Sequence, residues 1–393
     1  AKTYGMAGNR TLFGLILGQV FLHASMTGLR MAVPLSVLRA GGDKLAVAPL
    51  LAMFSISPLL FALAAGRLAD RHGYHLPLRL AVALTSSGAA LVLLAHHVAG
   101  PRYLMMCLGS MLSGAGGNVG LLTIQRTAGR SVQGGAELRR VFSWLGMAPS
   151  FSNFGGSMST GFLIDRAGFD AAFALLTVLP LGSLVCAQLV PREAPVGRTS
   201  VERRPAWDLL AGGSMRRLLL VSWLMAASWD LHSFLVPVLG TERQLSASAI
   251  GAILGSFALS VTAVRFLIPL IAQALSEATV LRSAIIVIAL VFAFYPLAHH
   301  AWSMTLCAVV LGFALGSSQP MVMASLHHIT PHDRQGEALA LRSMTGNTSS
   351  AIMPLVYGAM GTVLGISGLF WSMAAVVLLG SWVARKVGLN GPP

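Results

Sequence analysis

The sequence has very little charge for its length. Asp, Glu, Lys and Arg together make up 10% of its 393 residues, whereas hydrophobic residues make up 55%, and the mean hydropathy is +0.73. A soluble domain carries about a quarter charged residues. This shortage excludes an ordinary soluble globular protein and predicts a chain that lies mostly within a lipid bilayer.

Several chemical motifs are also missing. The three cysteines, Cys107, Cys186 and Cys307, all fall within apolar segments, so we expect neither a disulfide framework nor a thiolate metal site. No Gly-x-x-x-x-Gly-Lys-Ser/Thr loop occurs, which excludes drive by ATP at such a loop. No apolar segment carries a Ser/His/Asp set or a cluster of metal ligands at helical spacing, so we predict no enzyme, no metal and no cofactor.

Apolar runs recur along nearly the whole chain. Each is long enough to cross a hydrocarbon core of about 30 Å. Their Val, Leu and Ala residues with scattered Gly favour helices, and none shows the two-residue alternation of a membrane barrel. We predict an all-α membrane protein with twelve transmembrane helices, at Leu12–Leu38, Leu45–Leu63, Leu78–Leu94, Tyr103–Ile124, Val141–Ile164, Ala171–Val190, Leu218–Leu239, Ala249–Ile271, Val280–Leu297, Trp302–Leu326, Ser343–Leu364 and Ile366–Ala384.

One half of the chain repeats the other. Residues that recur 203 positions later include Pro34 and Pro237, Phe54 and Phe257, Ser57 and Ser260, and Arg79 and Arg282. Further along, the offset becomes 200 positions, as in Gly116 and Gly316. Duplicated halves of a membrane protein imply a binding site between them and alternating access to that site.

A single long polar segment divides the predicted helices into six and six. Residues 191–217 are rich in charged side chains and contain three prolines. The segment is too short to form a domain of its own. We predict an N-terminal six-helix bundle at residues 1–190, a linker at 191–217 and a C-terminal six-helix bundle at 218–393.

The net charge of +14 would suit a nucleic-acid-binding protein, but the placement of the basic residues argues against one. If the N-terminus lies in the cytoplasm, most of the 27 Lys and Arg residues fall in cytoplasmic segments. Cytoplasmic loops of membrane proteins carry such an excess. We predict a multi-pass protein of the plasma (inner) membrane with both termini in the cytoplasm, in contact with anionic lipid and not with nucleic acid.

The most specific local motif joins the second and third predicted helices. It reads Gly66-Arg67-Leu68-Ala69-Asp70-Arg71-His72-Gly73, and a weaker copy from Gly161 to Gly168 follows the fifth helix at the outer face. Together with the six-plus-six plan, the orientation and the central linker, this loop resembles the signature loop of the major facilitator superfamily (MFS). The resemblance covers the whole chain. It implies a secondary transporter built from two pseudo-symmetric six-helix bundles.

By this resemblance the motif forms a conformational clasp on the cytoplasmic side. Gly66 lets two helices approach closely, and Asp70 accepts hydrogen bonds at the N-terminus of the eleventh helix, predicted to begin near Ser343. The residues expected in the clasp are Gly66, Asp70, Arg71, Gly73 and Arg126. The alternative is a tight polar turn that only joins two helices. The second half has no charge at these places, where it reads Pro269, Gln273 and Ser276.

Two departures from the best-known drug-antiporter pattern occur in the first half. The fourth helix has Ser110 where that group usually carries an arginine. In the fifth helix, residues 151–156 keep paired glycines but lack the usual proline. These absences argue against a simple drug:proton antiporter and leave the expected fold unchanged.

Three charged residues lie within predicted helices, where each costs about 2.5–3.5 kcal/mol or more at the helix centre. We expect Asp230 in the seventh helix to pair with Arg30 in the first, because the repeat places Thr27 opposite Asp230 and Arg30 one turn further along. Substrate binding or protonation would break this pair, and the alternative is a permanent ion pair between the halves. Arg265 in the eighth helix either binds an anion or extends to the cytoplasmic interface.

Other polar residues complete the predicted site. His23 and His232 lie near the expected pair and would add proton-carrying capacity. Substrate contacts are expected from Asn118, Trp144, Trp229, Gln319 and Asn347, with interhelical hydrogen bonding as the alternative role of each. The excess of arginine over carboxylate in the cavity favours an anionic or zwitterionic substrate.

These features predict a secondary active transporter that works by rocker-switch alternating access. The first choice is proton-coupled efflux of a small organic or amphipathic compound, as an antiporter. The alternative is proton-coupled uptake of an organic anion. The expected partners are a small-molecule substrate, protons and membrane lipid, and we expect the monomer to function on its own.

Overall fold

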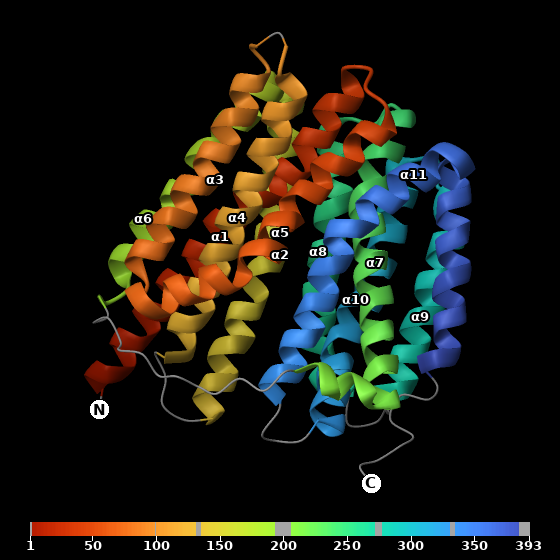
Figure 1. Cartoon of the computed structure of the whole chain (residues 1–393). Helices are drawn as coiled ribbons and strands as arrows, with labels where there is room; N and C mark the ends of the chain where they lie inside the picture. The colour runs from red at the N-terminus through yellow and green to blue at the C-terminus, as the bar shows by residue number, and fades with distance from the viewer. Residues whose placement is uncertain are drawn as a thin grey trace. The chain divides into compact units, whose positions relative to one another are not determined.

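The computed structural model of the chain describes residues 2–98, 100–130, 135–192, 206–271, 277–330 and 335–384. Every regular element within these ranges is a helix (Figure 1), so the predicted all-α class is confirmed. Up to residue 192 the elements are α1 (Lys2–Arg39), α2 (Lys44–His72), α3 (His75–Ala95), α4 (Arg102–Arg130), α5 (Gly135–Val178), α6 (Leu181–Cys186) and the short 3-10 helix η1 (Ala187–Leu189). From residue 206 they are η2 (Ala206–Ala211), α7 (Gly213–Glu242), α8 (Ala247–Ile271), α9 (Glu277–Phe294), η3 (Tyr295–Leu297), α10 (Ala301–Ile329) and α11 (Gln335–Ala384).

Nine helices within the described residues are long and apolar enough to cross a membrane, and Leu45–Phe61 in α2 is a shorter apolar helix. Two of the nine contain a break. α5 breaks at Gly168 (φ 84°, ψ 178°) and α11 at Gly365 (φ 69°, ψ 174°), a backbone conformation that glycine adopts without a steric penalty. Counting the two parts of each broken helix separately gives the predicted twelve segments, of which the one in α2 is the short one.

The chain divides into two compact units. Unit 1 consists of Ala1–Asp43, Pro49–Thr199 and Ser246–Gly255. Unit 2 consists of Lys44–Ala48, Ser200–Leu245 and Ser256–Pro393. Two helices therefore contribute to both units, because α2 begins in unit 2 and α8 begins in unit 1.

The internal repeat recurs in the packing of each unit. In unit 1, a Cβ added at Gly114 of α4 would collide with the backbone carbonyl of Phe54 in α2. In unit 2, a Cβ added at Gly312 of α10 would lie 2.5 Å from the carbonyl oxygen of Phe257 in α8. Phe54 and Phe257 are repeat partners in the sequence. Glycine thus permits the same close approach of two helices in both halves.

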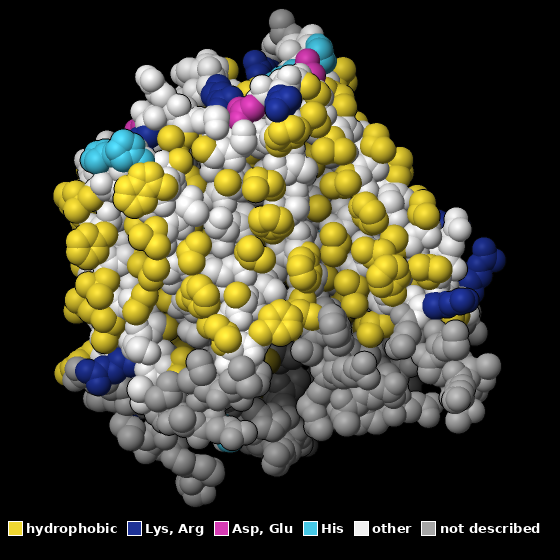
Figure 2. All heavy atoms as spheres, turned by 180° about the vertical axis from the view of Figure 1, so that it is seen from behind, with side chains coloured by type: hydrophobic (Ala, Val, Ile, Leu, Met, Phe, Trp, Pro, Cys, Tyr) yellow, Lys and Arg dark blue, Asp and Glu magenta, His cyan; other side chains and the backbone are white. Residues whose placement is uncertain are grey.

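Large apolar side chains remain exposed on the surface. Figure 2 shows hydrophobic side chains over most of the visible face. Over the described surface, the most exposed large hydrophobic side chains include Leu60 (67%), Trp302 (70%), Val363 (82%), Leu379 (74%) and Trp382 (66%). A soluble protein rarely exposes contiguous apolar surface on this scale, whereas lipid tails cover it at no cost.

Candidate functional site

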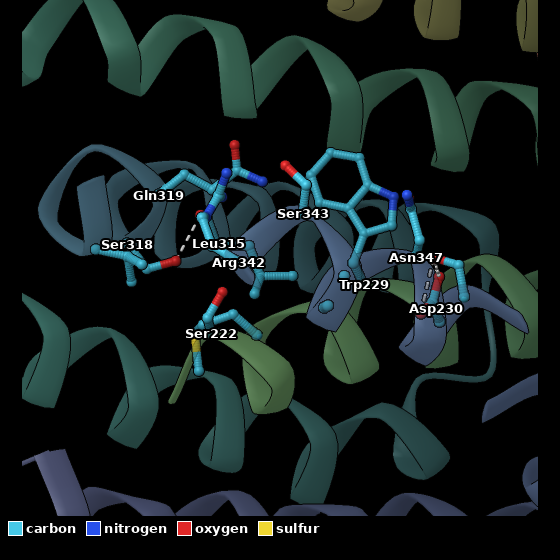
Figure 3. Close-up of a pocket in the computed structure, with 14 residues that line it drawn as sticks. Ser222, Trp229, Asp230, Leu315, Ser318, Gln319, Arg342, Ser343 and Asn347 are labelled. Atoms are coloured by element: carbon cyan, nitrogen blue, oxygen red, sulfur yellow. Dashed lines mark hydrogen bonds between the residues drawn. The ribbon is translucent and has the colours of Figure 1, made fainter. Parts of the chain in front are cut away.

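A cavity of about 350 Å³ lies within unit 2, between α7, α10 and α11. Its volume falls in the usual range for small-molecule sites, about 300–1,000 Å³. Each helix lines it with residues three or four positions apart, the spacing of one helical face. The lining residues are Ser222, Met225, Ala226, Trp229 and Asp230 of α7, Leu315, Ser318, Gln319 and Val322 of α10, and Arg342, Ser343, Gly346, Asn347 and Ser350 of α11 (Figure 3).

Asp230 is the carboxylate of this cavity, and its residue is only 3% exposed. The Ser350 hydroxyl donates to Asp230 Oδ1 at 2.9 Å, and the Ser349 hydroxyl donates to Oδ2 at 2.9 Å. One turn before Asp230, the carbonyl of Ala227 accepts a hydrogen bond of 2.7 Å from the buried Tyr357 hydroxyl. Three hydroxyls of α11 thus hold this part of α7, and two of them solvate the buried carboxylate.

Two arginines of unit 2 lie at the cavity, because Arg342 lines it and Arg265 binds the lining residue Gln319. Arg265 Nη2 donates to Gln319 Oε1 at 2.9 Å. Arg342 lines the cavity, and its buried Nε has no hydrogen-bond partner among the residues that the structure describes. The positive charge of Arg342 also acts on Arg265. Like charges at short range repel each other, so an anion placed here would be stabilised.

Aromatic rings lie at the cavity wall and next to it. Trp229 lines the cavity and packs edge-on against Phe257, with ring centroids 4.6 Å apart. His232 does not line the cavity. Its fully buried ring lies 4.5 Å from the Phe257 ring, and its Nδ1 lies 3.5 Å from the Tyr295 hydroxyl. The structure therefore places His232 in an aromatic core next to the cavity wall.

The predicted site residues of the first half lie in unit 1. The Arg30 guanidinium lies 5.9 Å from the centroid of the Phe54 ring, and its charge also acts on His23, seven residues earlier in α1. Thr27 Oγ1 donates to Asn153 Oδ1 at 2.7 Å, and Asn118 lies half-buried in α4. Because Arg30 and Asp230 belong to different units, their pairing stays a prediction. The Trp144 side chain lies outside the described part.

The predicted clasp is described only in part. Arg71 is exposed, Arg126 is half-buried, and Gly73 ends α2 with a φ of 68°. The structure does not describe Gln273 and Ser276, nor the side chains of Asp70 and Pro269. The contacts of Gly66 also lie outside the described part. The clasp therefore stays a prediction.

One element of that prediction is wrong. We expected the eleventh helix to begin near Ser343, whereas α11 begins at Gln335. Hydropathy marks where the apolar run begins, and the helix continues into the polar residues before it. As a result Arg342, which directly precedes the predicted span Ser343–Leu364, lies inside α11 and lines the cavity. The sequence does contain a sign of this placement, because Arg342, Gly346 and Ser350 are four residues apart, the spacing of one helical face.

The weak copy of the motif after the fifth helix forms a contact that we had not predicted. Asp165 of α5 accepts hydrogen bonds from the backbone N–H groups of Ala247 (2.9 Å) and Ser248 (2.7 Å) at the start of α8, and from the Ser248 hydroxyl. Arg39 Nη1 lies 3.9 Å from Asp165 Oδ1. All four residues belong to unit 1. The carboxylate therefore caps the positive end of α8.

The family model described as Major Facilitator Superfamily matches residues 15–217 and 218–392. The chain belongs to the Major Facilitator Superfamily. It is thus an integral membrane transporter, and the resemblance of the loop at residues 66–73 pointed to the right family. No curated protein sequence matches the chain.

Solved structures of other MFS-fold transporters resemble the chain over nearly its whole length. A POT family transporter in complex with 5-aminolevulinic acid has a TM-score of 0.78 at 14% identity and covers 96% of this chain and 97% of that one. A bacterial homologue of the human lysosomal transporter Spinster, in an inward-facing and occupied conformation, has a TM-score of 0.77 at 13% identity, with coverage of 96% and 97%. At such identities the likeness shows the fold alone.

Proposed function

We propose that this MFS protein is a secondary transporter that exports a small organic or amphipathic compound in exchange for protons. The observation that carries the proposal is Asp230, a buried carboxylate on the wall of a cavity of suitable size. Ionisable residues within membrane helices are costly and mark the paths of substrates and protons. Coupling to protons requires a group at the site that gains and loses one, and Asp230 supplies it.

The surroundings of Asp230 suit both of its protonation states. A hydroxyl donates to an ionised carboxylate, and after rotation it accepts from a protonated one. Ser349 and Ser350 both donate to Asp230 as it stands. Neither protonation state then leaves a buried oxygen without a hydrogen bond, which would cost about 1–3 kcal/mol.

Alternating access is part of the proposal. Bundles at residues 1–190 and 218–393, joined by the linker at 191–217, rock about the site with both termini in the cytoplasm. The Arg30–Asp230 pair forms in one state, and protonation or substrate breaks it. The clasp at Asp70 closes the cytoplasmic side of the protein when the site is open to the other side of the membrane. The inward-facing conformation of the Spinster homologue supports such motion in this fold.

Proton-coupled uptake of an organic anion is the second candidate. The observation in its favour is the pair of arginines beside the cavity, with the Arg342 Nε buried and without a hydrogen bond within the described residues. Two solved POT structures that resemble the chain are complexes with small charged compounds, one with 5-aminolevulinic acid and one with sulfate.

Proton movement in everted membrane vesicles tests the proposal and separates the two candidates. Vesicles with an acidic interior receive organic cations, anions and zwitterions in turn, and acridine orange fluorescence reports the interior pH. Exchange raises the interior pH when a substrate is added, whereas cotransport with protons lowers it further. Vesicles without the protein control for passive entry of weak acids and bases.

Two variants show whether Asp230 carries the proton. Asp230→Asn keeps the size of the side chain and removes its ionisation, so proton movement should cease. Asp43→Asn, at an exposed position, serves as the matched control and should behave as wild type. Proton movement that persists in Asp230→Asn at the wild-type rate would reject the proposal.

A further inference from the structure

The cavity of unit 2 has two chemically different ends. Figure 3 shows Ser222, Gln319 and Arg342 toward one end, and Asp230 with Asn347 toward the other. One end offers hydrogen-bond donors and positive charge, and the other offers a carboxylate.

The first end is built to receive an anion. The Gln319 oxygen accepts a hydrogen bond from Arg265, and the Gln319 NH2 group is a hydrogen-bond donor. Arg342 adds a guanidinium whose buried Nε has no partner in the described part of the chain. The two arginines repel each other, and a carboxylate or phosphonate bound at Arg342 and Gln319 relieves that repulsion.

The second end is built to receive a cation. Asp230 accepts hydrogen bonds from the Ser349 and Ser350 hydroxyls, and an ionised carboxylate attracts an ammonium group by charge. The Trp229 ring lines the cavity between its two ends (Figure 3), and aromatic faces attract ammonium groups. A protonated amine satisfies both neighbours at once.

The distance between the ends sets the length of the ligand. Ser222 and Asp230 are eight residues apart on α7, and Arg342 and Ser350 are eight residues apart on α11. At 1.5 Å per residue, this separation is about 12 Å along a helix axis. Side chains from both ends reach into the gap and shorten it. An α-amino acid, whose two charges share one carbon, is too short to meet both ends.

We propose that this cavity binds an elongated organic zwitterion, with its anionic group at Arg342 and Gln319 and its ammonium group at Asp230. This inference rests on the proposed function in one respect, namely that the bound zwitterion is the transported solute. It gives a role to both the one arginine and the one carboxylate among the lining residues. The ammonium group and the coupling proton then compete for Asp230.

The test uses the purified full-length protein in detergent and a series of unbranched ω-amino acids from glycine to 8-aminooctanoate. Hexanoate and hexylamine carry one charge each and serve as the single-charge controls. Thermal stabilisation over a concentration series yields an apparent Kd for each compound. We expect the longer ω-amino acids to bind at least about tenfold more tightly than glycine, hexanoate or hexylamine, the ratio that one lost charge contact of about 1.4 kcal/mol produces.

Variants assign each end of the ligand to its partner. In Arg342→Gln, 6-aminohexanoate should bind no better than hexylamine, and in Asp230→Asn no better than hexanoate. Gln319→Glu is nearly isosteric and puts a carboxylate beside both arginines, so it should abolish binding of the series. Arg282→Gln removes an exposed arginine of α9 and serves as the control that keeps wild-type affinity.

Three outcomes would overturn the proposal: no stabilisation by any member of the series, equal binding of hexylamine and 6-aminohexanoate to wild type, or unchanged selectivity in Arg342→Gln and Gln319→Glu. Binding to the purified protein requires no proton movement, so these results are independent of the vesicle assay. Proton exchange that depends on Asp230 without zwitterion selectivity rejects only this inference. If the zwitterions bind but proton exchange does not depend on Asp230, only the proposed coupling of transport to protons is rejected.

Discussion

Asp165 of α5 accepts a hydrogen bond of 2.7 Å from the backbone N–H of Ser248, in the first turn of α8. The contact links two helices that are 83 residues apart in sequence. It satisfies amide groups that a helix N-terminus leaves without intrahelical partners, and it places negative charge at the positive end of the helix dipole. In the predicted topology this contact lies at the outer face, opposite the cytoplasmic loop that contains Asp70.

Replacing Asp165 should therefore destabilise the start of α8. We expect Asp165→Ala to lower the free energy of unfolding by about 1 kcal/mol, as for the loss of other N-cap side chains. Asp165→Asn keeps an oxygen that accepts from an amide and should lose less. Thermal unfolding in detergent measures both. The capping role fails if Asp165→Ala and wild type unfold at the same temperature.

The packing of α5 against α8 leads to a pair of opposite effects. A Cβ added at Gly251 of α8 would lie 2.5 Å from the carbonyl oxygen of Ser157 in α5, so Gly251→Ala should push the helices apart and cost about 1–3 kcal/mol. A Cβ added at Gly155 meets nothing within 4 Å. Gly155→Ala should therefore be neutral or stabilise the protein by up to about 1 kcal/mol, because alanine favours helix. Equal melting temperatures for the two variants would contradict this account.

Most of the fold could be predicted from the sequence, because every membrane-spanning segment needs an apolar run and internal hydrogen bonds. The breaks at Gly168 and Gly365 fall between the runs predicted as separate helices. The start of α11 could not be predicted in the same way. Its first residues include the charged Glu337 and Arg342. Because this part of the helix is polar, hydropathy does not distinguish it from the loop before it.

The cavity was only partly predictable. Asp230, Trp229, Gln319 and Asn347 were conspicuous as polar or aromatic residues within apolar runs, and the structure brings them together. Arg342 was not conspicuous, because the sequence pattern of an arginine at the edge of an apolar run does not differ from that of an arginine in a cytoplasmic loop. The serines that hold Asp230 are two among many, and only the packing of α7 against α11 distinguishes them.

Stability should depend on pH through His96, which caps the end of α3 outside the membrane-spanning segment. Burial, and next the charge of Arg102, lowers the pKa of His96 below its ordinary value of 6.5, against the opposing effect of Asp170 at 3.2 Å. As pH falls below about 6.5, the unfolded chain takes up the proton first, so stability present above that pH is lost. We expect the melting temperature to fall between pH 7.5 and 5.5, and His96→Gln to reduce that fall. The same pH profile in both proteins would show that another group is responsible.

The last prediction concerns the coupling between α7 and α11 at the carboxylate. Ser349→Ala removes the hydroxyl that donates to Asp230 Oδ2 at 2.9 Å, and it should cost about 1–3 kcal/mol because the charge stays buried with fewer donors. In the Asp230→Asn background the same substitution should cost less, since a neutral amide loses a weaker hydrogen bond. The double-mutant cycle should therefore show an interaction of about 0.5–3 kcal/mol in thermal or denaturant unfolding. Strict additivity would mean that Ser349 does not stabilise the charge of Asp230, and that the carboxylate is solvated in some other way.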